Sequence, residues 1–531
     1  MDQDKLNELY KTLKKYDLDI LNKFCDESIS DVEYFSYGIK NEIISNALNV
    51  LTNYLLGNIG SAGIDNSCRT IIEALVIEKM DSEGVISKEQ KEIYRYLYAY
   101  VDLDNYHAFK DQVDLSNPNI IRLNNDKEKA KKAIMNHFKC SNGDLKKRSV
   151  DIDDPCFYLK RNLKERIRFA YLLKRFPIEF EFKTHAYSLF SIFAHPRCEL
   201  NEEVDNMLLN YRLISVDAVL SMVDDFLKTK GLVLSKEEIE NSTDFNNDFS
   251  NNPKLTYNII NLGNINFAFS ILIKELCMFE NGVDYYTAQF LRQSCALIKD
   301  MCISLWLGYK EHTISNFKSF IENFSVFYAI NSISDINTFN ITKRAFWISS
   351  RLQFDEYFKS VGIKDGSLQD EEIRKIYDDF YKEKYALEDY DLFKKNLKKN
   401  SLYFLSDSAK SYNKFVNEFV RKTFINENES KDIIAIYKTS KDISHASGYG
   451  FNASESMVDI NSHKSLLFAW KFMINFCLNA RINLKAHNKK NDLTEIIKFF
   501  SEFANDEIKE IGEIIESYSS NSKTSDNNKK E

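Results

Sequence analysis

The chain has 531 residues, a formal net charge of −8 and a pI near 5.7. This length exceeds what a single hydrophobic core usually supports, so we expect at least two domains. The acidic balance gives no overall attraction to nucleic acids or anionic membranes, and such binding would need a local basic patch.

Proline and cysteine usage narrow the fold class and the compartment. All five prolines lie in the first half, and the long remainder without proline is typical of helices rather than turn-rich β-folds. The nine cysteines are odd in number and scattered, which favours reduced thiols over a disulfide framework. With no apolar signal region and no apolar run of 18 residues, we expect a soluble, cytoplasmic, all-α protein that does not bind membranes.

Apolar residues recur at helical spacing along most of the chain, beginning with Leu6, Leu9 and Leu13. In the first half the main helices are expected over 32–56, after an Asp65 cap, and over 125–138, 156–175, 180–194 and 203–228. Residues 228–253 are rich in Gly, Ser, Asn and Asp, which is a connector composition. We therefore place an N-terminal helical bundle over 1–245.

The second half resumes the helical pattern and forms a C-terminal bundle over 246–518. Its helices are expected over 255–280, 284–307, 313–330, 335–360, 369–386, 408–424, 429–444, 462–485 and 492–518. Residues 519–531 contain almost no apolar side chain and are expected to form a disordered tail.

The common nucleotide, metal and hydrolase motifs are missing from the sequence. It has no phosphate loop, no Gly-x-Gly-x-x-Gly after a strand, no His-Glu-x-x-His, no Cys-x-x-Cys and no Gly-x-Ser-x-Gly. Two His-x-x-Cys pairs, His137 with Cys140 and His195 with Cys198, could supply four zinc ligands, but their separation exceeds that of compact zinc modules. We expect neither a metal nor a cofactor.

A tyrosine precedes a histidine by eight residues once in each half, at Tyr187 and His195 and again at Tyr437 and His445. On a helix this spacing places both side chains on one face. An arginine helix precedes each pair and carries Arg69 with Glu73 in the first half and Arg292 with Ala296 in the second. The histidines are 250 residues apart and the arginines 223, which suggests a divergent tandem duplication.

This pattern resembles the bacterial helical domains allied to the HEPN class (higher eukaryotes and prokaryotes nucleotide-binding). The first half matches at Arg69, Glu73, Tyr187, Ser191 and His195. The second half keeps Arg292, Tyr437 and His445 but has Ala296 and Lys441 at the other two positions. The resemblance implies an all-α fold of two tandem HEPN-like bundles, the second of them degenerate.

Active HEPN ribonucleases use an arginine and a histidine four to six residues apart, paired across a dimer and independent of metal. Arg481 and His487 have this spacing. The resemblance thus implies an RNA-targeting effector, a ribonuclease of bacterial anti-phage defence or toxin type, with RNA as a partner and a homodimer as the assembly. The candidate catalytic residues are Arg69, Glu73, Tyr187, His195, Arg292, Tyr437, His445, Arg481 and His487.

A competing interpretation gives these residues a purely structural role. An arginine paired with a glutamate and a tyrosine bonded to a neighbouring histidine can satisfy the polar interior of a helical bundle. The protein would then be a non-enzymatic scaffold or sensor that binds a partner protein. Basic segments such as 394–399 could contact RNA, although most are interleaved with acids as on an ordinary exposed face. The sequence leaves both interpretations open.

Overall fold

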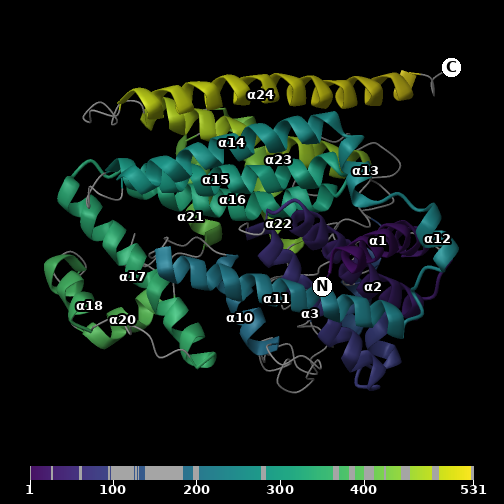
Figure 1. Ribbon diagram of the computed structural model, residues 1–531. Helices are drawn as coiled ribbons and strands as arrows, with labels where there is room; N and C mark the ends of the chain where they lie inside the picture. Colours follow the sequence, from purple (N-terminus) through teal and green to yellow (C-terminus); the bar gives the residue numbers. More distant parts are fainter. Residues whose placement is uncertain are drawn as a thin grey trace.

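The described part of the chain is almost entirely helical (Figure 1). The computed structural model describes residues 2–24, 28–58, 62–93, 96, 125, 128–129, 131–137, 141, 183–194, 202–276, 283–362, 370–381, 389–399, 412–423, 426–443, 455–480 and 490–527. These ranges contain no strand, so the expected all-α class is confirmed. None of the helices within them combines the length and the apolar content that crossing a membrane requires.

The first half is a bundle of long helices around one core. Its helices are α1 (Gln3–Phe24), α2 (Asp31–Leu55), α3 (Ala62–Ser82), α10 (Lys183–Phe193) and α11 (Glu202–Thr229). Helix α2 packs on α1 and α3, α10 packs on α3, and α11 crosses both α2 and α3. Leu13 and Ile72 are among the buried residues of this core. Ser30 caps α2 in a reciprocal box with Glu33, and the helix begins at Asp31, one residue before the expected start at 32.

The second half repeats this order of packing. Its corresponding helices are α14 (Pro253–Leu276), α15 (Val283–Trp306), α16 (Lys310–Asn331), α22 (Glu427–Ile443) and α23 (Glu455–Ala480). Helix α15 packs on α14 and α16, α22 packs on α16, and α23 crosses α15 and α16. Gly57 and Gly308 have positive φ angles of 65° and 89° just after α2 and α15, so each helix ends in the left-handed conformation that glycine allows.

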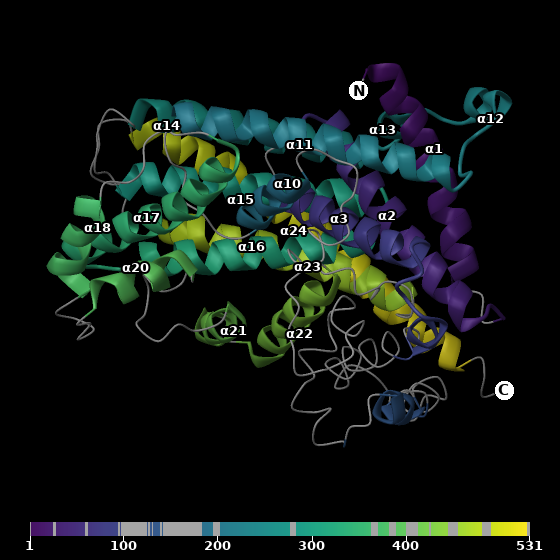
Figure 2. The ribbon, with the colours of Figure 1, turned by 90° about the horizontal axis from the view of Figure 1, so that it is seen from below.

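The second half also contains helices inserted between α16 and α22. They are α17 (Ile336–Ser360), α18 (Asp370–Ile376), the π-helical turn η2 (Tyr377–Tyr381), α20 (Tyr390–Lys399) and α21 (Tyr412–Thr423). Both Figure 1 and Figure 2 show α18 and α20 at the end of the molecule opposite α1. Helix α17 packs on α10, where Phe354 lies against Phe193 and both belong to one buried cluster with Tyr357. The inserted helices thus help to join the two halves.

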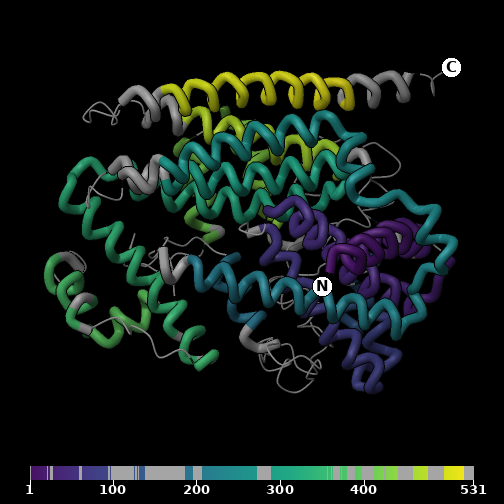
Figure 3. The backbone as a smooth tube through the Cα atoms, viewed as in Figure 1, coloured from purple at the N-terminus to yellow at the C-terminus, as the bar shows by residue number. Residues whose placement is uncertain are grey.

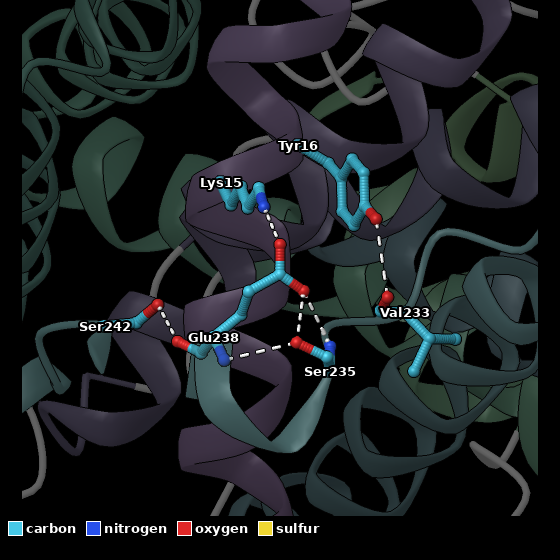
Figure 4. A network of polar contacts seen from close by, with 6 residues as sticks. All are labelled: Lys15, Tyr16, Val233, Ser235, Glu238 and Ser242. Carbon is cyan, nitrogen blue, oxygen red and sulfur yellow. Dashed lines mark hydrogen bonds and ion pairs between the residues drawn. The ribbon is translucent and has the colours of Figure 1, made fainter. Parts of the chain in front are cut away.

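The connector between the halves folds back on the first bundle. It contains two short helices, α12 (Lys236–Asn241) and α13 (Phe245–Ser250), where the composition alone indicated a loop. Figure 4 shows Glu238 bonded to the backbone and hydroxyl of Ser235 and paired with Lys15 of α1. Phe245 is buried in the first core and meets the ring of Tyr10 edge-on at 5.3 Å. The connector therefore packs with α1.

Helix α24 (Lys490–Asn527) packs on α23 and α14 and runs along one side of the molecule (Figure 3). It ends later than expected, because the helix continues eight residues beyond 519, where the sequence predicts the start of a disordered tail. Ile497, Phe500 and Ala504 bury one face of α24 against the second core. The hydrophobic pattern marked the buried part of this helix and not its end.

Candidate functional site

The predicted residues of the first half that the structure describes come together between α3 and α10. The hydroxyl group of Tyr187 donates a hydrogen bond of 2.8 Å to Oε1 of Glu73. Arg69, one turn earlier on α3, has its guanidinium 3.9 Å from the same oxygen and 5.7 Å from the centroid of the Tyr187 ring. Only 7% of Arg69 and 4% of Glu73 is exposed, so this set lies inside the bundle.

Burial governs the protonation of this set. It raises the pKa of Glu73, while the charges of Arg69 and Lys318 and the bond from Tyr187 oppose the rise. Burial and the adjacent carboxylate raise the pKa of the Tyr187 phenol far above its ordinary value. Tyr187 therefore remains a hydrogen-bond donor at every physiological pH and holds α10 to α3.

A second set of the same kind lies between α16 and α22. The hydroxyl group of Tyr437 donates a bond of 2.9 Å to Oε1 of Glu322, and Lys318 stands one turn before that glutamate. Lys318, Glu322 and Tyr437 are 3%, 2% and 0% exposed. Burial and the charge of Glu322 raise the pKa of the Tyr437 phenol, so this tyrosine too acts as a donor.

The second set uses a cation other than the arginine that the sequence predicted. Lys318 follows Arg69 by 249 residues, and Glu322 follows Glu73 by the same number. This offset is close to the 250 residues between Tyr187 and Tyr437. Arg292 was predicted for this role, but it lies one helix earlier, in α15, and is half-buried there. The search for an arginine missed a lysine that keeps the charge and the i,i+4 spacing.

The two sets face each other where α3 packs on α16. Lys318 is close enough for its charge to lower the pKa of Glu73 against the effect of burial. The amide of Asn66 on α3 donates a bond of 2.8 Å to the hydroxyl of Ser319 on α16, and both residues are buried. Each half thus contributes one cation, one glutamate and one tyrosine to a shared polar interior.

Further buried polar side chains extend this interface to α2 and α15. Ser304 donates to Oδ1 of Asn49 at 3.3 Å and accepts from the amide of Asn316 at 3.3 Å. Asn58 donates to a carboxylate oxygen of Asp300. Because buried polar groups are costly without partners, this network specifies how the two halves fit together.

An ion pair that the sequence analysis missed lies close to the end of α10. Nε of Arg212 donates to Oδ1 of Asp65 at 2.8 Å, and a second guanidinium nitrogen contacts the other carboxylate oxygen. The guanidinium also lies 4.6 Å from the ring centroid of Phe193. Arg212 and Asp65 are 2% and 0% exposed. The sequence signal is a charged residue on the apolar face of α11, and Asp65 was assigned instead to a helix cap.

Several predicted site residues lie outside the described ranges. They are His195, His445, Arg481 and His487, and the side chain of Lys441. The predicted meeting of Arg69 with His195 therefore stays a prediction, while Ser191 lies in α10 and is half-buried. Across the residues the structure does describe, no cluster of three or more His, Cys, Asp or Glu side chains is placed to hold a metal ion.

One surface hollow lies apart from these sets. It is an open pocket of about 810 Å³ beside the start of α2, lined by residues that include Ser30, Asp31, Lys88 and Lys91. None of the predicted site residues lines it.

Neither a protein-family model, nor a curated protein, nor a solved structure matches this chain.

Proposed function

We propose that the chain is an RNA-targeting effector built from two HEPN-like bundles in tandem. The observation that carries the proposal is the meeting of two equivalent buried sets, each a cation, a glutamate and a tyrosine, at the contact of α3 with α16. The nearly equal sequence offsets of 249, 249 and 250 residues and the repeated order of helix packing support a duplication. The two bundles of one chain would then form the pair of HEPN domains that single-domain HEPN proteins form by dimerising.

The buried sets have a positioning role in this proposal. Arg69 and Glu73 are too deeply buried to contact a polynucleotide, and the hydroxyl of Tyr187 already donates its hydrogen bond to Glu73. Their bonds fix the end of α10, and His195 follows that end by two residues in the sequence. We assign the chemistry to His195 and to the Arg481 and His487 pair, with His445 as the degenerate copy.

The proposed reaction is metal-independent cleavage of RNA. A histidine takes the proton of a ribose 2′-hydroxyl while the 2′-oxygen attacks the adjacent phosphorus, and the 5′-oxygen leaves with a proton donated by a second histidine or by water. An arginine stabilises the charge that develops on the phosphate oxygens. The products are a 2′,3′-cyclic phosphate and a 5′-hydroxyl. Such an activity in the bacterial cytoplasm would act as a toxin or in anti-phage defence.

The test is cleavage of labelled single-stranded RNA by the purified chain in EDTA. We expect His195→Ala or His487→Ala to abolish cleavage without changing the melting temperature, and His137→Ala, a histidine outside the predicted site, to retain it. Product ends should be a cyclic phosphate and a 5′-hydroxyl. If the wild-type chain leaves diverse RNAs intact, or if both histidine variants cleave normally, the proposed function is wrong.

A non-enzymatic scaffold is the second candidate, and the burial of Arg69 and Glu73 favours it. In that case the two sets only stabilise the contact between the halves. Tyr187→Phe would lower the melting temperature, and RNA would remain intact with every variant. The two candidates thus differ in RNA turnover and agree on stability.

A further inference from the structure

Helix α14 carries a row of exposed apolar side chains. Tyr257, Ile260, Phe267 and Ile271 are 50%, 55%, 68% and 45% exposed, and we call these four residues the α14 stripe. At 100° per residue they fall within about 80° around the helix axis and span about 21 Å along it. They are four of the twelve large apolar residues that are exposed in the described part of the chain. They therefore form one row on the helix, in which the exposed Asn264 lies between Ile260 and Phe267.

The opposite face of α14 is apolar as well. Leu262, Ile265 and Phe269 are buried in the second core, and Leu255 on the same face is also buried. A helix that is apolar on both faces is normally covered on both. An exposed row of this kind on a soluble surface is typical of a binding site for another protein.

The charge beside the α14 stripe indicates what would cover it. Helix α24 adjoins the stripe, because the ring of Tyr257 lies edge-on to Phe503 at 5.7 Å and Lys254 bonds to Glu507 and Glu510. Among the α24 side chains that the structure describes, the exposed charges are two lysines and six acids, Glu495, Glu502, Asp506, Glu510, Glu513 and Glu516. Phe499, 47% exposed, adds an apolar side chain to this edge. The surface is thus apolar with an acidic border.

We propose that the α14 stripe and the acidic border of α24 together bind a basic amphipathic helix of a partner protein. The apolar face of such a helix would cover the stripe, and its lysines or arginines would face the carboxylates of α24. A second copy of this chain would bring its own acidic border against this one, and RNA would meet the same carboxylates with its phosphates. Both are disfavoured by repulsion between like charges. The inference is independent of RNA cleavage.

The probe is a fluorescent synthetic peptide of about 18 residues, long enough to cover the stripe as a helix. One version has a leucine face and a lysine and arginine face, and a matched version carries glutamate in place of the basic residues. At physiological salt we expect the basic peptide to bind the full chain at least about tenfold more tightly than the acidic one. Ile260→Gln with Phe267→Gln should weaken binding about tenfold or more.

Matched variants separate this site from nonspecific attraction. Leu18→Gln with Ile214→Gln removes two side chains that are 60% and 56% exposed on other helices, and peptide binding should not change. Glu502→Lys with Asp506→Lys should reduce the preference for the basic peptide. Equal binding of both peptides, or equal loss with the control variant, would overturn the proposal. So would a dimer of the free chain that Phe267→Gln dissociates, or displacement of the peptide by single-stranded RNA.

Discussion

The hydroxyl group of Tyr437 donates a hydrogen bond of 2.9 Å to Glu322, in the same way that Tyr187 bonds to Glu73 in the other half of the chain. Tyr437→Phe removes the donor and leaves the buried carboxylate to lose that bond. We expect a loss of about 1–3 kcal/mol in the free energy of unfolding, measured by urea denaturation. Tyr257→Phe, at a half-exposed tyrosine, should change stability by less than about 0.5 kcal/mol. Equal effects of the two variants would contradict a structural role for the Tyr437 bond.

Removing one partner of the buried ion pair of Arg212 and Asp65 should lower the stability strongly, whereas replacing both partners with apolar residues should lower it little. Arg212→Met leaves an uncompensated carboxylate in the interior and is expected to lower stability by about 3–5 kcal/mol. Arg212→Met with Asp65→Leu should recover most of that loss, since no buried charge remains. Lys498→Ala breaks a pair whose side chains are 68% and 66% exposed and should cost at most about 1 kcal/mol. Denaturant curves of the four proteins would decide this prediction.

The close approach of α3 to α16 depends on Gly63. A Cβ atom at this position would lie 2.5 Å from Oδ1 of Asn316, which is buried and bonded to Ser304 and so cannot easily move aside. Gly63→Ala should therefore destabilise the protein by about 1–3 kcal/mol. Gly263→Ala, also inside a helix but with open space around its Cβ, should be stabilising by about 0.5–1 kcal/mol. Thermal melts that show the same sign for both variants would argue against a tight contact.

His312 should make stability fall in mild acid. Its ring nitrogen Nε2 lies 3.2 Å from the backbone oxygen of Ser45, and burial lowers its pKa to about 4. Below pH 6.5 His312 binds a proton in the unfolded chain, whereas in the folded chain it binds one only below about pH 4. Stability on the order of 3 kcal/mol, present above pH 6.5, is therefore lost as the pH falls to about 4.

Comparison with His312→Gln isolates this effect from other groups. Asp17, whose pKa is raised to about 7 by burial and the nearby Glu311, acts in the opposite direction, because protonation favours the folded state there. The difference in unfolding free energy between wild type and variant should therefore shrink from pH 7 to pH 4. A difference independent of pH would mean that His312 has the same pKa in the folded and unfolded chains and would contradict this prediction.

The helical class and most helix positions followed from the sequence, because apolar spacing reports which face a helix buries. The predicted helix 335–360 and the observed α17 differ by one residue at one end. Ends were less predictable, as at α24, where side chains without a buried face give no periodic signal. Short helices such as α12 were not predicted either. The cap at Ser235 and the ion pair of Glu238 stabilise α12, and its composition gives no helical signal.

The site was predictable in its first half and only partly in its second. Arg69, Glu73 and Tyr187 have the expected spacing and come together. Lys318 was not predicted, because a lysine in an apolar helix is normally expected to be exposed. Its role becomes evident only when its distance in sequence from Arg69 is compared with the distance between Tyr187 and Tyr437. The pair of Arg212 and Asp65 joins residues 147 apart, and no local pattern links positions so distant.

The covalent joining of the two bundles has a consequence for how each of them changes. In an assembly of identical subunits every substitution occurs on both sides of the contact, whereas here each side can vary alone. The position 249 residues after Asp65 is Ile314, so the buried ion pair belongs to one side only. Because the effective concentration of one half at the other is fixed by the connector, the contact also survives dilution that would separate a weak dimer.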